Sequence, residues 1–192
     1  MGASGWAYRV PYQQDIQRAL DELRQLVFEH GAFLKGDPWW RDMEFAEFLP
    51  PEDLDAAELA EYRVEFDRLQ ALEEPTTIQE WIDWNGEEGT NSILDVDRVV
   101  AELPPVSEFP ASADEADQQA WFAASSARFG TVSPLTGAEA MAILGTDRPT
   151  YELVLERLEP VQQLRDKGAG VYVVVFDGDA PAEIVFTGFS GD

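Results

Sequence analysis

The alternation of apolar residues near the C-terminus predicts a β-hairpin. Residues 171–176 are apolar at both alternating sets of positions, and a second β-branched and aromatic run at 184–186 follows the turn Asp177-Gly178. An Asp-Gly turn between two such runs is a strong local signal for a hairpin. A strand that is apolar on both sides needs cover on both faces. We therefore expect the hairpin to lie centrally in a sheet that is packed by helices.

Two longer stretches show the period of an amphipathic helix. Residues 13–30 place apolar side chains at spacings of four, three and four, and Gly31 follows as a C-terminal stop. Pro50-Pro51 precedes the second predicted helix, over residues 52–72. The apolar stripe of this second helix consists of Leu59, Tyr62, Phe66 and Leu69.

Capping signals predict the starts of further helices. Residues of the Ser/Thr-x-x-Glu type begin at Thr77, Ser112 and Thr136, and each such capping box favours a helix that starts there. Thr150 caps a last helical pattern, which Pro160 is expected to kink or divide. The chain is therefore expected to contain about five helices.

Residues 92–100 have the alternation of a third strand, with Asp95 and Asp97 on the polar side. We expect this strand to pair with the C-terminal hairpin, and the N-terminal arm, residues 1–12, to extend the sheet. The predicted fold class is α+β: a small antiparallel sheet including the C-terminal hairpin, packed by about five helices. A single domain over residues 1–192 is expected.

Charge is concentrated in the middle of the chain. The formal net charge of the 192 residues is -25, and residues 37–74 and 75–117 contribute -10 each. Four-fifths of the net charge therefore lies between Asp37 and Asp117. Such a field repels nucleic acid and anionic lipid and attracts basic partners. We expect a basic protein partner, with no nucleic acid and no membrane among the partners.

Composition excludes several kinds of chemistry. The chain contains no cysteine, which excludes disulfides, thiolate nucleophiles and thiolate metal sites. No apolar run approaches the ~20 residues that a membrane-spanning helix needs. Neither a Gly-x-Ser-x-Gly nucleophile motif nor a glycine-rich phosphate loop occurs. We expect a cytoplasmic protein without a cofactor.

Carboxylate chemistry is the one catalytic class that these exclusions leave open. The lone histidine, His30, lies at a helix end, where a partial positive charge favours the helix dipole. Glu87, Glu88, Asp95 and Asp97 lie within eleven residues, and carboxylates of this kind bind Ca²⁺ or Mg²⁺. The twelve-residue EF-hand pattern is absent, so no metal site is assigned, and no catalytic residue is predicted.

Several segments resemble a known group of proteins. They are residues 89–95 (GTNSILD), 145–150 (GTDRPT), 170–176 (GVYVVVF) and 188–192 (GFSGD), together with the arm from Trp6 to Tyr12 and the first helix. In these segments the chain resembles an uncharacterised family of small acidic actinobacterial proteins with no assigned activity. The resemblance implies a bacterial source and a single domain, and it carries over no functional residue.

Aromatic side chains and carboxylates alternate within the acidic part of the chain. This combination is typical of tight, electrostatically steered protein interfaces. The predicted partner-binding residues are Trp39, Trp40, Asp55, Glu58, Glu61, Glu65, Trp81, Trp84, Glu87 and Glu88. Four of them, from Asp55 to Glu65, recur at spacings of three and four, either as a solvated helix face or as a carboxylate ladder for a basic partner.

The leading functional hypothesis is an acidic protein-binding module of the immunity or antitoxin kind. It would inhibit a basic partner that acts on nucleic acid, because a dense carboxylate surface imitates phosphates. One alternative is a small housekeeping or regulatory domain whose acidity reflects only its proteome. The other is a carboxylate-based, metal-dependent enzyme.

Overall fold

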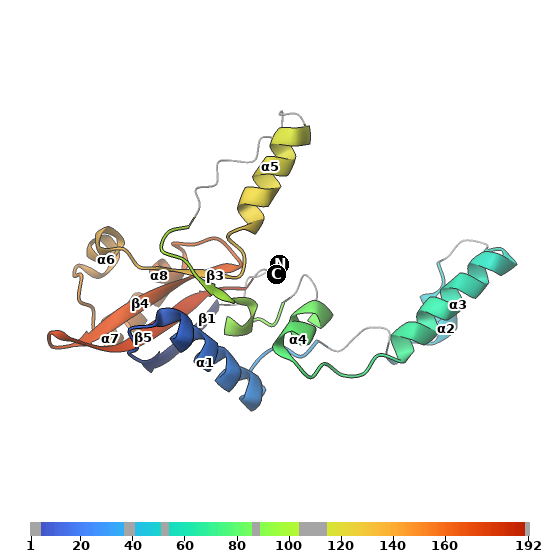
Figure 1. The fold of residues 1–192 in the computed structure, drawn as a ribbon, viewed down its shortest axis with the longest axis horizontal. Coiled ribbons are helices and arrows are strands. Elements are labelled where there is room, and N and C mark those ends of the chain that lie inside the picture. Colours follow the sequence, from blue (N-terminus) through green and yellow to red (C-terminus); the bar gives the residue numbers. More distant parts are fainter. Residues whose placement is uncertain (1–4, 37–40, 51–53, 86–88, 104–114, 191–192) are drawn as a thin grey trace. The chain divides into compact units, whose positions relative to one another are not determined.

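The chain divides into two compact units. The computed structural model describes residues 5–36, 41–50, 54–85, 89–103 and 115–190. Residues 1–34 and 86–192 form one unit, which we call the sheet unit, and residues 35–85 form the other, which we call the helical unit (Figure 1). The expectation of a single domain over residues 1–192 stays a prediction.

A five-stranded mixed sheet is the centre of the sheet unit. Its strands are β1 (Gly5–Pro11), β2 (Arg98–Val99), β3 (Thr131–Pro134), β4 (Ala169–Asp177) and β5 (Ala180–Phe189). In the order β1-β5-β4-β3-β2, the first three strands pair antiparallel, whereas β4, β3 and β2 pair parallel. The α+β class that the sequence predicts is confirmed.

The C-terminal hairpin forms as the sequence predicts. Strands β4 and β5 pair from Gly170 opposite Gly188 to Asp177 opposite Ala180. Gly178 in the turn has a φ of 60°, a left-handed conformation that glycine adopts without steric cost. Both hairpin strands lie inside the sheet, because β1 pairs with β5 and β3 pairs with β4. The prediction that the N-terminal arm extends the sheet is confirmed by β1.

The predicted strand over residues 92–100 is wrong for most of its length. Ile93–Asp95 form a short 3-10 helix, η2, and only β2 is extended. Strand β2 pairs parallel with β3, not antiparallel with the hairpin. The side chains of Ser92 and Asp95 accept hydrogen bonds from the backbone N–H groups of Leu94 and Thr90, respectively. Such local bonds compete with the sheet ladder, which explains why the alternating pattern did not become a strand.

The helices of the sheet unit are α1 (Ile16–His30), α5 (Glu115–Ser126), α6 (Gly137–Leu144), α7 (Tyr151–Glu156) and α8 (Leu158–Gln162). Helix α1 begins after Asp15, whose side chain accepts from Arg18 N, and it ends at Gly31 with a φ of 64°. His30 binds the carbonyl oxygen of Leu26 through its Nδ1 at 2.8 Å, which supports the structural interpretation of this histidine.

Most of the predicted helix starts are confirmed. Thr136 and Glu139 form a reciprocal capping box at α6, and Thr150 caps α7. Thr77 and Glu80 do the same at α4 (Ile78–Asn85). The signal at Ser112 lies outside the described residues.

Pro160 divides its helix as expected. A proline ring clashes with the carbonyl group four residues before it. In this chain that residue is Glu156, where α7 ends, and α8 begins two residues later. The break therefore falls one helical turn ahead of the proline.

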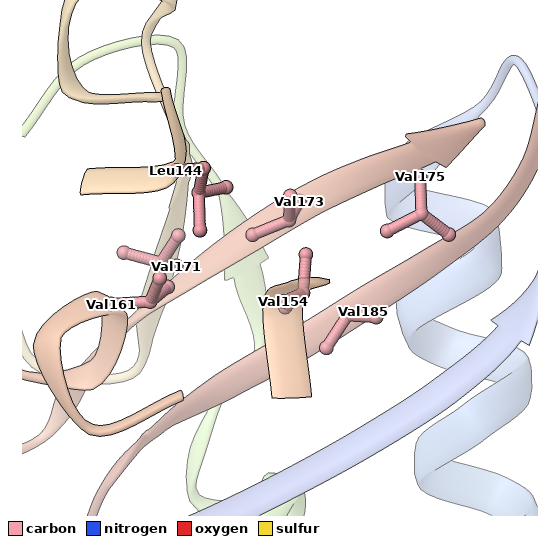
Figure 2. Close-up of a cluster of buried hydrophobic side chains, with 7 residues drawn as sticks. All are labelled: Leu144, Val154, Val161, Val171, Val173, Val175 and Val185. Atoms are coloured by element: carbon pink, nitrogen blue, oxygen red, sulfur yellow. The ribbon is translucent and has the colours of Figure 1, made fainter. Parts of the chain in front are cut away.

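One face of the sheet packs against α6, α7 and α8. The central cluster combines one set of alternating positions of β4 and β5 with side chains from these helices: Leu144, Val154, Val161, Val171, Val173, Val175 and Val185 (Figure 2). Helix α1 lies behind the strands in the same view, on the other side of the sheet. The prediction that the hairpin is covered on both faces is therefore confirmed.

On the face of α1, the ring of Trp6 occupies a slot that two glycines leave open. A Cβ atom at Gly170 would lie 2.8 Å from Cη2 of Trp6, and one at Gly188 would lie 2.7 Å from its Cζ2. Those distances are shorter than real Cβ contacts, so a larger residue at either position would displace the indole. Trp6 is buried as a result.

The helical unit contains α2 (Phe45–Phe48), α3 (Ala56–Gln70) and α4. Its aromatic cluster brings the ring of Phe66 to 5.4 Å from Phe45 and 5.3 Å from Phe48, and Phe48 also contacts Tyr62. Of the predicted apolar stripe of α3, only Phe66 is buried, whereas Leu69 is half-buried and Leu59 and Tyr62 are exposed. Within the described ranges of the chain, no helix is long and apolar enough to cross a bilayer.

Candidate protein-binding surface

The first turn of α3 uses two of the predicted partner-binding carboxylates for its own capping. Oδ1 of Asp55 accepts from the backbone N–H groups of Ala57 at 2.7 Å and Glu58 at 3.0 Å, and Oε2 of Glu58 accepts from Asp55 N at 2.8 Å. The hydrogen bonds from Glu58 and Ala57 lower the pKa of Asp55. Asp55 and Glu58 therefore define where α3 begins, although both remain exposed.

Glu65 is engaged on its own helix. Its two carboxylate oxygens accept from Nη2 and Nε of Arg68 at 2.6 and 2.8 Å, in a bidentate pair. The Arg68 guanidinium lowers the pKa of Glu65. Glu61, between these residues, is exposed and has no hydrogen bond or ion pair within the described parts of the chain. Three of the four carboxylates of the ladder, Asp55, Glu58 and Glu65, are therefore engaged on their own helix, and Glu61 is open to solvent.

Helix α3 exposes apolar side chains together with its carboxylates. The exposed fractions of Leu59 and Val64 are 42% and 70%, and that of Tyr62 is 37%. A surface helix normally turns such side chains toward a core. In a fifteen-residue helix with one buried residue, most of the apolar surface is left uncovered within the helical unit.

A hollow of about 470 Å³ lies elsewhere in the helical unit, between the end of α3 and α4. Its lining consists of Leu72, Glu73, Glu74, Pro75, Thr76, Glu80, Asp83 and Trp84. Trp84 is half-buried, and its Nε1 donates to the carbonyl oxygen of Gly36 at 3.1 Å. The guanidinium carbon of Arg41 lies 5.8 Å from the centroid of the Trp84 ring. This hollow joins an aromatic wall to several carboxylates.

The other predicted tryptophan of α4 does not belong to the surface. Trp81 is only 4% exposed, with its ring 6.3 Å from that of Trp84 and with Lys35 Nζ 5.6 Å from its centroid. A side chain so deeply buried does not present its ring to a partner. Four further predicted residues, Trp39, Trp40, Glu87 and Glu88, lie outside the described residues.

Two of the four acidic residues considered for a metal site, Asp95 and Asp97, are described by the structure, and they differ in burial. Asp95 is half-buried, and its Oδ1 accepts from N and Oγ1 of Thr90 at 2.7 and 2.8 Å. Burial raises the pKa of Asp95. Asp97 is exposed and lies 3.3 Å from Nε of Arg98. Among the residues that the structure describes, no group of three histidine or acidic side chains is placed to hold a metal ion.

One charged pair in the sheet unit was not anticipated from the sequence. Nη1 of Arg165 donates to Oε1 of Glu139 at 2.7 Å, and Nε of Arg165 donates to Oγ of Ser133 at 2.8 Å. The Arg165 guanidinium lowers the pKa of Glu139 to about 2. Both residues line a polar cavity of about 230 Å³ beside the end of β3. The capping box identified Glu139 as a helix start, but no local signal indicates a partner 26 residues away.

Comparison of the chain with known protein families, curated proteins and solved structures gives no match.

The helical unit combines a strong negative charge with exposed apolar side chains. Among its described residues, Glu61 lies on the same helix as the exposed Leu59 and Val64, in a segment with fifteen acidic and four basic residues and a net charge of -11. Such a surface complements a basic protein surface, because opposite potentials steer the encounter and apolar contacts hold the complex.

Proposed function

We propose that this chain is an acidic protein-binding module, and that the helical unit binds a basic protein. The observation that carries the proposal is α3: a fifteen-residue helix with one buried residue, which exposes apolar side chains and carboxylates together. Burial of a Leu or Val side chain contributes roughly 1.5–3 kcal/mol. A partner that covers Leu59 and Val64 gains that free energy, and its basic residues gain from the surrounding field.

The kind of partner follows from the charge. A segment of 51 residues with a net charge of -11 repels nucleic acid and attracts the basic surfaces of proteins that act on nucleic acid. We therefore propose an inhibitor of the immunity or antitoxin kind, which acts in the cytoplasm and covers the basic surface of a nucleic-acid-acting protein. The resemblance to acidic actinobacterial proteins remains a prediction, and it agrees with a bacterial setting for such a pair.

A housekeeping or regulatory domain whose acidity reflects its proteome is the main alternative. It predicts that the acidic surface has no dedicated partner and that the charge is spread without regard to structure. The exposed apolar residues beside the carboxylates of α3 favour the binding module. The carboxylate-based enzyme has no supporting geometry among the described residues.

Affinity capture with the full chain, followed by measurements on the purified pair, tests the proposal. We expect a basic protein whose Kd weakens at least about tenfold as the salt concentration rises from about 50 mM to about 200 mM. In the variant Glu61→Gln/Val64→Ser, we expect a Kd weakened about tenfold, because it removes one exposed carboxylate and one uncovered apolar side chain of α3.

A matched control has the same kind of change in the sheet unit. Glu152→Gln/Leu155→Ser alters an exposed carboxylate and an exposed apolar residue of α7, and it should leave the Kd within about twofold. A captured partner that is not basic, a Kd indifferent to salt, or an equal loss in both variants would contradict the proposal.

A further inference from the structure

We propose that the hollow between α3 and α4 is a docking site for an arginine side chain of the basic partner. The inference rests on the proposed function and names the chemistry of one anchor within it. The hollow lies wholly in the helical unit and has a volume of about 470 Å³. A guanidinium group with its methylene stem fits such a space, with the stem on the apolar lining and the charge at the rim.

The floor and walls of the hollow suit the stem and the plane of an arginine. Leu72 and Pro75 supply apolar surface, and Trp84 supplies an aromatic ring. Leu72 is 41% exposed, so its side chain is accessible to a ligand in the hollow. Guanidinium groups stack on tryptophan more readily than ammonium groups do. Arg41 already lies within 6 Å of the Trp84 ring centroid, so this ring accepts a cation.

The carboxylates that line the hollow are of two kinds, and the first kind already accepts hydrogen bonds within the helical unit. Oε2 of Glu80 accepts from Thr76 N and Thr77 N at 2.8 and 3.0 Å, which ties this side chain to the start of α4. Oδ1 of Asp83 accepts from Nε2 of Gln79 at 2.8 Å.

Glu73 and Glu74 differ from these two. Both are exposed, and neither has a hydrogen bond or ion pair with a described residue. Two carboxylates at the mouth of an apolar hollow complement the fork of donors on a guanidinium, which binds carboxylates in a bidentate manner. The two carboxylates therefore favour a cation, and the ring of Trp84 favours a planar cation such as a guanidinium group.

Nuclear magnetic resonance titration of the full chain tests this site without the natural partner. The probe is a short oligoarginine peptide, and the matched probe is the same peptide with citrulline, its neutral isostere, at every position. We expect oligoarginine to shift the indole Nε1–H signal of Trp84 and the backbone amides of residues 73–76. The Trp84→Phe variant assigns the indole signal.

Substitutions distinguish a specific site from general attraction to an acidic chain. Glu73→Gln/Glu74→Gln should weaken the Kd for oligoarginine about tenfold at low salt, because it removes both free carboxylates at the rim. Glu152→Gln/Glu156→Gln removes the same number of charges from exposed positions of α7 and should change the Kd by less than about twofold. Circular dichroism confirms that both variants keep their helices.

The remaining outcomes all contradict the site. They are equal shifts with the citrulline peptide, equal or larger shifts with oligolysine, shifts confined to α3, and equal weakening by the two double variants. Failure here can be separated from failure of the proposed function. A captured partner whose Kd is unchanged by Glu73→Gln/Glu74→Gln overturns only the arginine site. Failure to capture a basic protein overturns the function and the partner assigned to the hollow, even where oligoarginine binds there.

Discussion

The two units of this chain distribute their apolar side chains in opposite ways. Among the described residues, twenty-two apolar side chains are buried, and only Phe66 and Trp81 of these belong to the helical unit. The sheet unit buries one face of β4 and half-buries the other, whereas α3 leaves most of its apolar positions in solvent. Small units with few buried residues are marginally stable alone. The difference indicates that the sheet unit holds most of the hydrophobic core and that the helical unit has few buried contacts of its own.

The largest expected effect tests the hydrophobic core of the sheet unit. Val173→Asp places a carboxylate at a position that is 2% exposed, between β4 and the helices α6 to α8. We expect the sheet unit not to fold, since an unpaired buried charge costs at least about 4 kcal/mol. Circular dichroism and urea unfolding measure this. Val174→Asp, at the half-buried neighbouring position, should be milder, and a folded Val173→Asp protein would contradict the assignment of the core.

A second variant tests the charged pair of Arg165 and Glu139 beside the end of β3. Arg165→Met leaves Glu139 without its guanidinium partner, and the side chain of Arg165 is only 9% exposed. We expect a loss of about 3 kcal/mol in the free energy of unfolding. Arg148→Met breaks the exposed pair with Asp179 and should cost less than about 0.5 kcal/mol. Equal losses in the two variants would show that the burial of Arg165 has no energetic consequence.

The helical unit is tested by Phe66→Ala. This change removes the ring that contacts Phe45 and Phe48, and we expect a loss of about 2 kcal/mol confined to residues 35–85. Hydrogen exchange should show reduced protection of the amides of α3, with the protection of β4 unchanged. Reduced protection in β4 would mean that the two units do not differ in the way described above.

The last prediction is a pH dependence that belongs to the sheet unit. The folded-state pKa of Glu139 is about 2, below its ordinary value of 4.5. The stability that ionised Glu139 contributes is therefore fully present above about pH 4.5 and is lost as the pH falls toward 2. Unfolding of the wild type and of Glu139→Gln should differ most at about pH 5 and converge near pH 2. A constant difference would contradict the assigned pKa.

Local signals predicted the parts of the fold that depend on few residues. The Asp177-Gly178 turn, the capping threonines and the break before Pro160 all act within one turn of chain, so they can be found in the sequence alone. Strand β3 has only four residues, too few for an alternation to stand out. The parallel pairing of β2 with β3 depends on residues 33 positions apart, for which no local pattern exists.

The candidate surface was predicted in outline but not residue by residue. The acidic region was identified by charge alone, and charge does not distinguish a carboxylate that caps a helix, such as Glu58, from a free one, such as Glu61. Trp81 and Trp84 are three residues apart on one short helix, yet one is buried and the other lines the hollow. The free carboxylates Glu73 and Glu74 follow α3 and carry no motif, so only the structure indicates them.

The slot that holds Trp6 ties together three positions from opposite ends of the chain. A side chain at Gly170 lacks room even without the indole, because its Cβ would also lie 2.9 Å from the carbonyl oxygen of Thr187, and a Cβ at Gly188 would lie 3.0 Å from Cα of Gly170. Loss of the indole leaves a void of its size against the sheet, and a larger residue at position 170 does not fill it. In any set of related sequences, glycine should therefore persist at position 170 even where the residue at position 6 is small.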